Sequence, residues 1–326
     1  MRKKKIKVIE ETPNREEVII IDGMNLVYRT HYAFNKLSYK GNPTGMFYGF
    51  ATILKHYLQA KHPSLIVVAW DGKKHPKRLK AVPGYKGHRQ EKRTGENEEA
   101  YKKFLELRNK TMLMLYLMGI PQAHNSKVEG DDMVYLLMKK YVAQDYQVRI
   151  ISSDKDMLQL CHSNRVIIER PNVRGSRKGY GNPVMAGSLV EIELGPGIDE
   201  TKAVDFFCLT GDSSDDIPGY RMVGPVKSSQ FIRKFGSIKA FLDNKDLRYP
   251  GIKRKKLRKL WKINRLMIDL KFFCDKYYTP EHITWYKDKQ YPNYQEDKFF
   301  KFCRKRGMSS LTLASFTNYI KQHAQK

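Results

Sequence analysis

Blocks of apolar residues that lead into an aspartate constrain the fold of this chain more than any other feature. They read VIIID at residues 18–22, LIVVAWD at 65–71 and VRIISSD at 148–154, and RVIIE at 165–169 is a further apolar block. Uninterrupted apolar runs of this length, separated by helical segments, are typical of buried strands in a parallel sheet with both faces covered. The sequence therefore predicts an α/β fold.

Helical spacing of apolar residues fills the gaps between these blocks. It occurs in residues 45–59, around 97–118 and in 129–142, a segment that opens with three acids. Residues 203–242 then read as helix, acidic turn, glycine turn and helix, and 253–262 begins a basic, mainly helical stretch. We expect a sheet domain followed by a helical region.

The aspartates that follow the apolar blocks predict a shared site. Asp22, Asp71 and Asp154 all sit at the carboxyl ends of predicted strands, the edge where parallel sheets bind ligands. A single residue separates Asp154 from Asp156. Two ionised carboxylates roughly 6 Å apart repel each other by about 3 kcal/mol at an effective dielectric constant near 20. We expect a cation to neutralise this pair.

Further carboxylates belong with these four. The full set with candidate places at this edge is Asp22, Asp71, Glu129, Asp131, Asp132, Asp154, Asp156, Asp212 and Asp215. Each alone also fits a local role, because acids cap helices and shape turns. Together, in a chain short of acids, they indicate a metal site of all-oxygen ligands, which favours Mg²⁺ or Mn²⁺ over zinc. Two ions about 4 Å apart, the arrangement used for in-line phosphoryl displacement, fit so large a set.

The charge of the chain predicts a polyanionic partner. Lys and Arg total 61 against 34 Asp and Glu, a formal charge of +27, which favours DNA or RNA. Ribosome-associated and membrane-surface proteins can be equally basic. The four cysteines form no CxxC pair, so we expect reduced thiols in a cytoplasmic protein. We find no signal peptide, no membrane-spanning run and no phosphate-loop or HExxH motif.

Six blocks of the sequence carry a resemblance to a known family. They are IDGMNLVYRTHYAF, VVAWDGK, PGYKGHR, VEGDDM, SSDKDMLQL and LTGDSSDDIPGY. In this order they resemble the 5′-nuclease (flap endonuclease) family, which includes phage 5′-exonucleases, phage RNase H and the nuclease domain of bacterial DNA polymerase I. The similarity runs from about residue 18 to 242. The C-terminal stretch, with NRLMIDL and RGMSSLTLASFTNYI, resembles the RNase H of T-even-type phages.

The resemblance implies a PIN-like parallel-sheet nuclease core with a helical arch, followed by a mainly helical region that contains a helix–turn–helix. Residues 1–16 would be a flexible basic arm. Residues 17–195 would form the nuclease core, with the arch at about 73–110. Residues 196–326 would form a helical DNA-binding domain, with the helix–turn–helix at about 203–242.

The resemblance also implies how the carboxylates divide between two Mg²⁺ ions, for which Mn²⁺ can substitute. The ligands of the first ion would be Asp22, Asp71, Glu129 and Asp131, some through water. The ligands of the second would be Asp131, Asp154, Asp156 and Asp212, with Asp132 and Asp215 as outer or secondary ligands. A water would attack the phosphodiester in line and leave a 5′-phosphate and a 3′-hydroxyl.

Basic and aromatic residues would contact the nucleic acid. Lys86 and Arg89 of the third block would act in catalysis by neutralising charge on the phosphate, with a solvated basic surface as the alternative. Tyr85 would stack on a base of a single strand, or else be a buried tyrosine. The duplex backbone would be held by Lys227, Arg233, Lys234, Lys253, Arg254, Lys255 and Lys256. For the last four, a solvated helix face is the alternative.

The resemblance implies a structure-selective 5′-nuclease that removes RNA primers and 5′ DNA flaps by two-metal hydrolysis, as 5′-exonuclease, flap endonuclease and RNase H. Its setting would be phage DNA replication, in the host cytoplasm. Its partners would be branched DNA and RNA–DNA duplexes with a single-stranded 5′ end. A single-strand-binding protein and a sliding clamp are open as protein partners. We expect a monomer that does not bind membranes.

Two alternatives to this function stay open. A catalytically weak or inactive structure-selective DNA-binding protein is the first, because two positions depart from the family pattern. Asp216 stands where Asn is usual, and Pro225 occupies a glycine turn where a residue with an N–H is usual. A short PIN-like RNase is the second, although such chains usually end after the sheet domain.

Overall fold

The computed structural model describes residues 15–87, 96–161, 165–171, 184–185 and 187–324. Its centre is a sheet with the strand order β5-β4-β1-β6-β7-β8. The strands are β1 (Glu17–Asp22), β4 (Leu65–Trp70), β5 (Gln122–His124), β6 (Gln147–Ile151), β7 (Val166–Glu169) and β8 (Val184–Met185). All neighbours pair in parallel except β7 and β8. The predicted parallel α/β sheet is thus confirmed.

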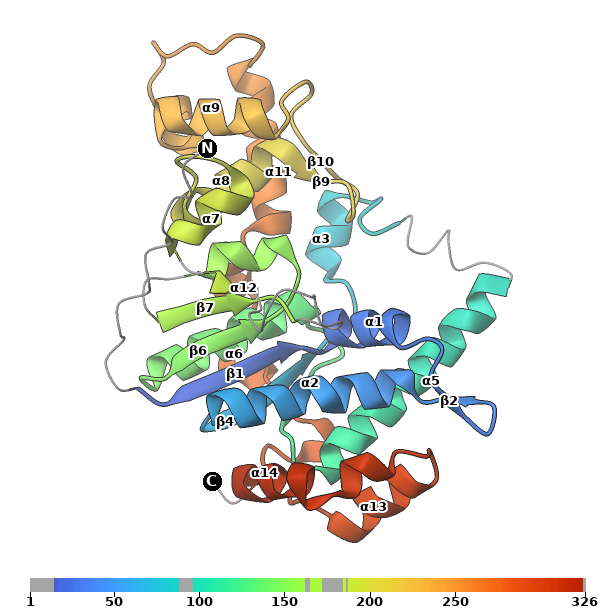
Figure 1. The fold of residues 1–326 in the computed structure, drawn as a ribbon. Helices are drawn as coiled ribbons and strands as arrows, with labels where there is room; N and C mark the ends of the chain where they lie inside the picture. The colour runs from blue at the N-terminus through green and yellow to red at the C-terminus, as the bar shows by residue number, and fades with distance from the viewer. Residues whose placement is uncertain (1–14, 88–95, 162–164, 172–183, 186, 325–326) are drawn as a thin grey trace, which may run out of the picture.

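The sheet is covered on both faces because its strands are apolar on both sides. Along β1, Val18 and Ile20 belong to one apolar core, whereas Ile19 and Ile21 belong to another. The second core is shared with α1 (Gly23–Ala33), α2 (Gly45–Lys61) and α5 (Glu96–Leu117). The first is shared with α6 (Gly130–Ala143) and α12 (Leu270–Tyr277) (Figure 1). The helices predicted at 45–59, around 97–118 and at 129–142 are confirmed as α2, α5 and α6.

A group of helices lies at one end of the molecule, above the sheet in Figure 1. These helices are α7 (Gly187–Leu194), α8 (Glu200–Thr210), α9 (Pro225–Phe235), α10 (Ile238–Asp243) and α11 (Arg254–Ile268). Between α8 and α9 the chain forms a small antiparallel hairpin of β9 (Gly211–Asp212) and β10 (Ile217–Pro218). Apolar residues of α8 to α11 continue the first core of the sheet, so this end of the molecule is packed directly onto the sheet.

The C-terminal helices return to the other face of the sheet. α13 (Glu296–Arg304) packs against α5, and α14 (Ala314–Ala324) packs against α2. Phe299, Phe302 and Phe316 are buried in the second core. The predicted helical region 196–326 is helical, but its helices therefore belong to two different cores.

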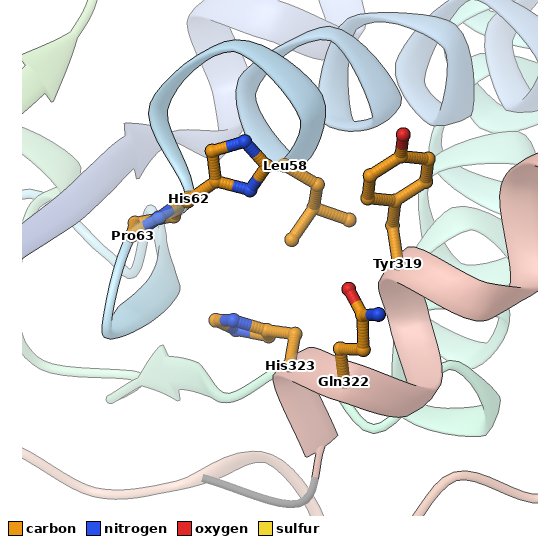
Figure 2. A pocket seen from close by; sticks show the side chains of 6 residues that line it. All are labelled: Leu58, His62, Pro63, Tyr319, Gln322 and His323. Carbon is orange, nitrogen blue, oxygen red and sulfur yellow. The ribbon is translucent and has the colours of Figure 1, made fainter.

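A small pocket marks the seam between α2 and α14 (Figure 2). Its lining residues are Leu58, His62, Pro63, Tyr319, Gln322 and His323. His323 Nε2 accepts a hydrogen bond of 3.1 Å from the backbone N–H of Ile66, near the start of β4. The C-terminal helix thus helps to hold the amino end of this strand, the end opposite Asp71.

The remaining elements are short. They are β2 (Ser38–Tyr39), β3 (Asn42–Pro43), α3 (Pro76–Ala81) and the 3₁₀ helices η1 (Lys155–Leu160), η3 (Pro280–His282), η4 (Tyr286–Asp288) and η5 (Ser309–Thr312). The predicted reduced thiols are confirmed, because Cys161, Cys208, Cys274 and Cys303 are all free and buried. Among the described residues, none of the helices has the length and apolar character needed to cross a membrane.

Candidate metal and nucleic-acid site

The carboxyl ends of three neighbouring strands bring the first aspartates together. Asp22 ends β1, Asp71 follows β4, and Asp154 follows β6. Asp22 also caps α1, because its Oδ1 accepts a 3.0 Å hydrogen bond from the N–H of Asn25. Its Oδ2 accepts a 2.9 Å bond from the Ser152 hydroxyl, which ties the ends of β1 and β6 together. The sheet topology thus places these acids along one edge, as the sequence predicted.

The start of α6 adds the next acids to this edge. The N–H of Gly130 donates a 2.6 Å hydrogen bond to Asp71 Oδ1, so the first turn of α6 lies against the end of β4. Asp131 in that turn is close enough to the other acids to feel their charge. Burial, followed by repulsion from Asp154, raises the pKa of Asp131 well above its ordinary value.

The last acids come from η1 and from the β9–β10 hairpin. Asp154 caps η1 by accepting a 2.9 Å hydrogen bond from the N–H of Asp156. Asp212 accepts hydrogen bonds from the N–H and the hydroxyl of Ser214, at 2.9 and 2.8 Å. Burial, followed by repulsion from Asp154 and Asp212, raises the pKa of Asp156 well above its ordinary value. The Asp154–Asp156 repulsion expected from the sequence is therefore present.

The donor set at this acidic edge fits a hard divalent cation. All of its acids offer oxygen ligands, and Asp156 Oδ1 is buried without a hydrogen-bond partner in the described part of the chain. Burial raises the pKa of Asp22 to about 6, and repulsion from Asp154 and Asp71 adds to this effect. Among the described residues, however, no three His, Cys, Asp or Glu side chains lie close enough to hold one ion between them.

A buried arginine, which the sequence reasoning missed, organises the other side of the edge. Arg78 of α3 is only 2% exposed. Its Nη1 donates to Glu129 Oε1, and its two terminal nitrogens donate to the two oxygens of Asp132, all at 2.8 Å. Its guanidinium also lies 3.8 Å from the centre of the Phe273 ring. The sequence held one signal for such a partner. Glu129 and Asp132 lie three residues apart at the start of a buried helix, and buried acids need a neighbouring positive charge.

The pairing with Arg78 changes the interpretation of Asp132. The family resemblance implies that Asp132 is an outer or secondary metal ligand. In the structure its carboxylate is fully buried and also accepts a 3.2 Å hydrogen bond from the Tyr278 hydroxyl. Both oxygens are thus engaged by Arg78 and Tyr278 rather than directed at the other carboxylates. Asp132 is better described as the partner that fixes Arg78.

Residues of the PGYKGHR block meet Glu129 from the other side. Lys86 Nζ lies 3.1 Å from Glu129 Oε2 and 3.5 Å from Asp215 Oδ2. Burial lowers the pKa of Lys86, but the charges of Glu129, Tyr85, Asp131 and Asp215 together raise it more, so the net shift is upward. Lys86 therefore stays charged and joins Glu129 to the β9–β10 turn. Arg89 lies outside the described residues.

Tyr85 is the buried tyrosine that the sequence left open as an alternative. It is 3% exposed, and its hydroxyl donates a 3.0 Å hydrogen bond to Glu129 Oε2. A buried ring has no free face on which a base can stack, so the stacking role predicted for Tyr85 does not fit this structure. Its hydroxyl instead helps to fix the carboxylate of Glu129.

Most of the predicted duplex contacts are exposed. Lys227, Arg233 and Lys234 lie on α9, and Lys253, Lys255 and Lys256 lie at the start of α11. Arg254 differs from these six. It donates a 2.7 Å hydrogen bond to the Leu247 carbonyl, and its guanidinium lies 4.6 Å from the centre of the Phe241 ring. This arginine ties α11 to α10, which makes it a structural residue rather than a free phosphate contact.

The two departures from the family pattern have local explanations. Pro225 is the first residue of α9 after the Gly224 N-cap, a position where the missing N–H has no helical partner to lose. Asp216 adopts a left-handed backbone conformation with φ +58°, which Asn and Asp tolerate better than most residues. Both residues are therefore compatible with the turn that they occupy.

Comparison with known proteins agrees with this geometry. Residues 17–183 match the family model of the 5′-3′ exonuclease N-terminal resolvase-like domain. The chain is 30% identical to a 5′-3′ exonuclease of Aquifex aeolicus, covering 77% of this chain and 82% of the relative. It is also 30% identical to the thermostable DNA polymerase I of Thermus aquaticus, over 79% of this chain but only 29% of the polymerase.

A solved structure shares the fold. A flap endonuclease of bacteriophage T5, in a complex with DNA and metal ions, superposes with a TM-score of 0.64 at 20% identity, covering 95% of this chain and all of the other. The family model matches more than half of the chain, and the Aquifex relative matches over most of its length. The chain belongs to the 5′-3′ exonuclease family.

Proposed function

We propose that this protein is a structure-selective, Mg²⁺-dependent 5′-nuclease that cuts phosphodiesters near single-stranded 5′ ends. The observation that carries the proposal is the buried acidic edge. Asp22, Asp131 and Asp156 are each repelled by Asp154, and Asp156 Oδ1 has no hydrogen-bond partner in the described part of the chain. So costly an arrangement is stabilised by divalent cations, and the donors are the hard oxygens that Mg²⁺ or Mn²⁺ prefers.

Two Mg²⁺ ions suit the number of donors. We assign Asp22, Asp71, Glu129 and Asp131 to the first ion, and Asp131, Asp154, Asp156 and Asp212 to the second, with Asp215 as a secondary ligand. Contacts through water agree with the absence of a closely packed triad among the described residues, because protein-bound Mg²⁺ usually keeps several waters. When bound, the ions supply a water of lowered pKa and stabilise the leaving oxygen.

The protein's own side chains orient the substrate around this edge. Lys86 carries a charge next to Glu129 and Asp215, where it can neutralise charge that builds up on the scissile phosphate. Glu129 receives hydrogen bonds from Arg78, Tyr85 and Lys86 on its two oxygens. We keep Glu129 as a ligand that contacts the metal through water, and we assign it a second role as the anchor of Arg78, Tyr85 and Lys86.

The substrate is proposed to be branched DNA or an RNA–DNA duplex with a free 5′ strand. Exposed lysines on α9 and α11 support binding to a duplex backbone, and the T5 relative was solved with DNA and metal ions. RNA primer removal in phage replication, and contacts with a single-strand-binding protein or a sliding clamp, are further parts of the proposal. We also propose that the chain is divided into an arm at 1–16, a core at 17–195 and a helical DNA-binding domain at 196–326. The protein would act as a monomer.

Cleavage of a labelled 5′-flap DNA tests this function. We expect cutting near the junction in Mg²⁺ or Mn²⁺ and none in EDTA. Asp154→Asn should lower the rate by at least about 100-fold, since even supporting residues of metal sites cost about 10–100-fold, while flap binding persists. The matched control is Asp297→Asn at the exposed start of α13, which removes the same charge far from the acidic edge and should leave the rate unchanged.

Two outcomes would contradict the proposal. Tight flap binding without cutting in either metal would favour an inactive structure-selective DNA-binding protein. Cutting of an RNA hairpin in preference to the DNA flap would favour a PIN-like RNase.

A further inference from the structure

A buried asparagine in α11 holds the turn that carries Asp212 and Asp215. Asn264 is 0% exposed. Its Nδ2 donates a 2.9 Å hydrogen bond to the Cys208 carbonyl and a 2.7 Å bond to the Pro218 carbonyl. Both partners are acceptors, so only the amide nitrogen can satisfy them. One side chain thus clamps the end of α8 to β10, the two stems of the turn.

The asparagine leaves one buried polar atom without a hydrogen bond, which indicates that its amide is not there for packing. Asn264 Oδ1 is buried and has no hydrogen-bond partner in the part of the chain that the structure describes. The residue lies on the buried face of α11, at helical spacing from Leu257 and beside Met267, where an apolar side chain would leave no orphaned oxygen. What an apolar residue would lose is the pair of donated hydrogen bonds.

The turn between the stems is too tight to absorb a shift of either one. Gly211 has φ +71°, and a Cβ on it would come within 2.3 Å of Gly219 N. A Cβ on Gly219 would in turn approach the Thr210 carbonyl oxygen to 2.2 Å. The backbone of the stems is therefore in close contact, and a movement of β10 must move the residues between the stems, including Asp212 and Asp215.

The start of α11 holds the same turn at a second point. The N–H of Lys253, the N-cap of α11, donates a 2.8 Å hydrogen bond to the Tyr220 hydroxyl. The N–H of Tyr220 in turn donates a 2.7 Å bond to the Leu209 carbonyl. Helix α11 is therefore fastened to the turn near its beginning through Tyr220 and further along through Asn264.

The opposite face of α11 is basic and open to solvent. Its exposed lysines are Lys255, Lys256, Lys259 and Lys262. The same helix that offers charge to a nucleic-acid backbone on one side thus grips the acidic turn on the other. A helix moves as a unit, so a displacement of α11 is passed to the turn through hydrogen bonds that it donates directly.

We propose that Asn264 is a positioning residue for cleavage, which sets Asp212 and Asp215 at the acidic edge and links their position to the seating of α11 on a duplex. The inference rests on the proposed function, because it takes these two acids as metal ligands and the lysine face of α11 as a duplex contact. It adds a residue outside the acidic edge whose loss weakens metal binding rather than DNA binding.

The test compares Asn264→Leu with Met267→Ala. Asn264→Leu keeps a side chain of similar size but removes both donated bonds. Met267 is 4% exposed on the same helix, and its thioether has no hydrogen to donate to either carbonyl, so Met267→Ala perturbs packing without opening the clamp. Asn264→Gln, which keeps the amide, is the conservative variant. Thermal unfolding of all three confirms that they are folded at the assay temperature.

We expect Asn264→Leu to lower kcat on a 5′ flap by about 10–100-fold, since misplacement of a reacting group by about 1 Å can cost about 100-fold. The Mg²⁺ concentration for half-maximal rate should rise about tenfold, and so should the Kd for Mg²⁺ measured by calorimetry without DNA. The Kd for the flap in EDTA should stay within about twofold. Asn264→Gln should recover part of kcat, and Met267→Ala should match wild type in kcat and in Mg²⁺ affinity.

Amide hydrogen exchange of residues 211–220 gives a readout that does not depend on activity. It should be faster in Asn264→Leu than in wild type or Met267→Ala. Normal kcat, Mg²⁺ affinity and exchange in a folded Asn264→Leu would overturn the inference, as would equal losses in Asn264→Leu and Met267→Ala. Wild-type protein that neither binds Mg²⁺ nor cuts the flap would instead overturn the proposed function, and the role of Asn264 in cleavage with it.

Discussion

At the scale of single residues, three acids of the candidate site have a local structural role. Asp22 and Asp154 cap a helix with one oxygen, and Asp212 forms a turn with Ser214. These are the local roles that the sequence also allowed. They do not compete with metal binding, because a carboxylate has two oxygens and about four acceptor positions. Capping fixes the orientation of each carboxylate, which is what a preorganised site requires.

The buried Arg78 shows where residue-level reasoning from sequence fails. It lies in a stretch, 73–93, whose many lysines and arginines suggest a solvated surface. The structure instead buries this one cation between Glu129 and Asp132. Which arginine of a basic stretch turns inward depends on acids more than fifty residues away, so no local pattern could identify it.

Replacement of Arg78 should be far more damaging than replacement of its neighbours. Arg78→Met leaves two buried carboxylates without their cation, and breaking a buried ion pair in this way typically costs about 3–5 kcal/mol. Arg78→Lys should lose less, because it keeps the charge but not the two-pronged contact with Asp132. Urea unfolding followed by circular dichroism measures the difference. Lys77→Met, on an exposed position of the same helix, is the control; a loss under about 1 kcal/mol for Arg78→Met would contradict the buried pair.

At the scale of elements, the sequence predicts what is long and strongly patterned. The apolar blocks became β1, β4, β6 and β7, and three periodic segments became α2, α5 and α6. Two strands of the central sheet escaped prediction. β5 has three residues, Gln122–His124, and β8 has two, so neither carries a pattern, and both exist because a neighbouring strand offers an edge.

The candidate site likewise has a part that the sequence could predict and a part that it could not. Acids at strand ends could be placed together because parallel strands share one carboxyl edge. Asp132 and Tyr85 could not be placed, because the direction of a side chain in the first turn of a helix or in a short loop is set by tertiary contacts. Here those contacts are Arg78 for Asp132 and Glu129 for Tyr85.

The packing of α12 on α6 gives a pH-dependent prediction. Burial raises the pKa of Asp275, but the hydrogen bonds and charges of Lys139 and Lys271 together lower it more, to about 2. Because the folded pKa lies below the unfolded value of about 3.9, the ionised group stabilises the fold above about pH 4, and this contribution is lost as the pH falls toward 2. The side chain is 32% exposed, so we expect less than about 1 kcal/mol at pH 7.

Asp275→Asn should therefore lower the free energy of unfolding slightly at pH 7, and the difference from wild type should shrink between about pH 4 and 2. Guanidinium unfolding at several pH values measures this difference. Asp246→Asn is the control, because this exposed acid forms no ion pair within the described ranges. A difference that grows as the pH falls would show that the ion pairs of Asp275 do not stabilise α12 on α6.

At the scale of the whole molecule, the last helices of the chain pack back onto its first helices. α13 and α14 complete the core under α2 and α5, while α8 to α11 extend the core on the other face. The predicted duplex surface on α9 and α11 and the helix α13 thus lie at opposite ends of the molecule (Figure 1). This separation allows the effect of local charge to be distinguished from that of the overall charge of +27.

Charge removal at the two ends should affect nucleic-acid binding differently. In one variant Lys255, Lys256 and Lys259 of α11 become alanine; in the other Lys298, Lys301 and Lys305, in and just after α13, become alanine. Each loses three positive charges from exposed positions, so the net charge of the two proteins is equal. The long-range attraction to nucleic acid is then equal in the two variants, and they differ only in the contacts with phosphates that they have lost.

For each phosphate neutralised, the slope of log Kd against log salt changes by about 0.9 for a DNA duplex. If all three α11 lysines contact phosphates, the slope should fall by about 2.7 in the first variant and hardly change in the second. Fluorescence anisotropy with a labelled flap in EDTA, between about 50 and 200 mM KCl, measures binding without cleavage. Equal slopes in the two variants would mean that α11 contributes only general charge, and the duplex would then have to be held by α9 and the arch instead.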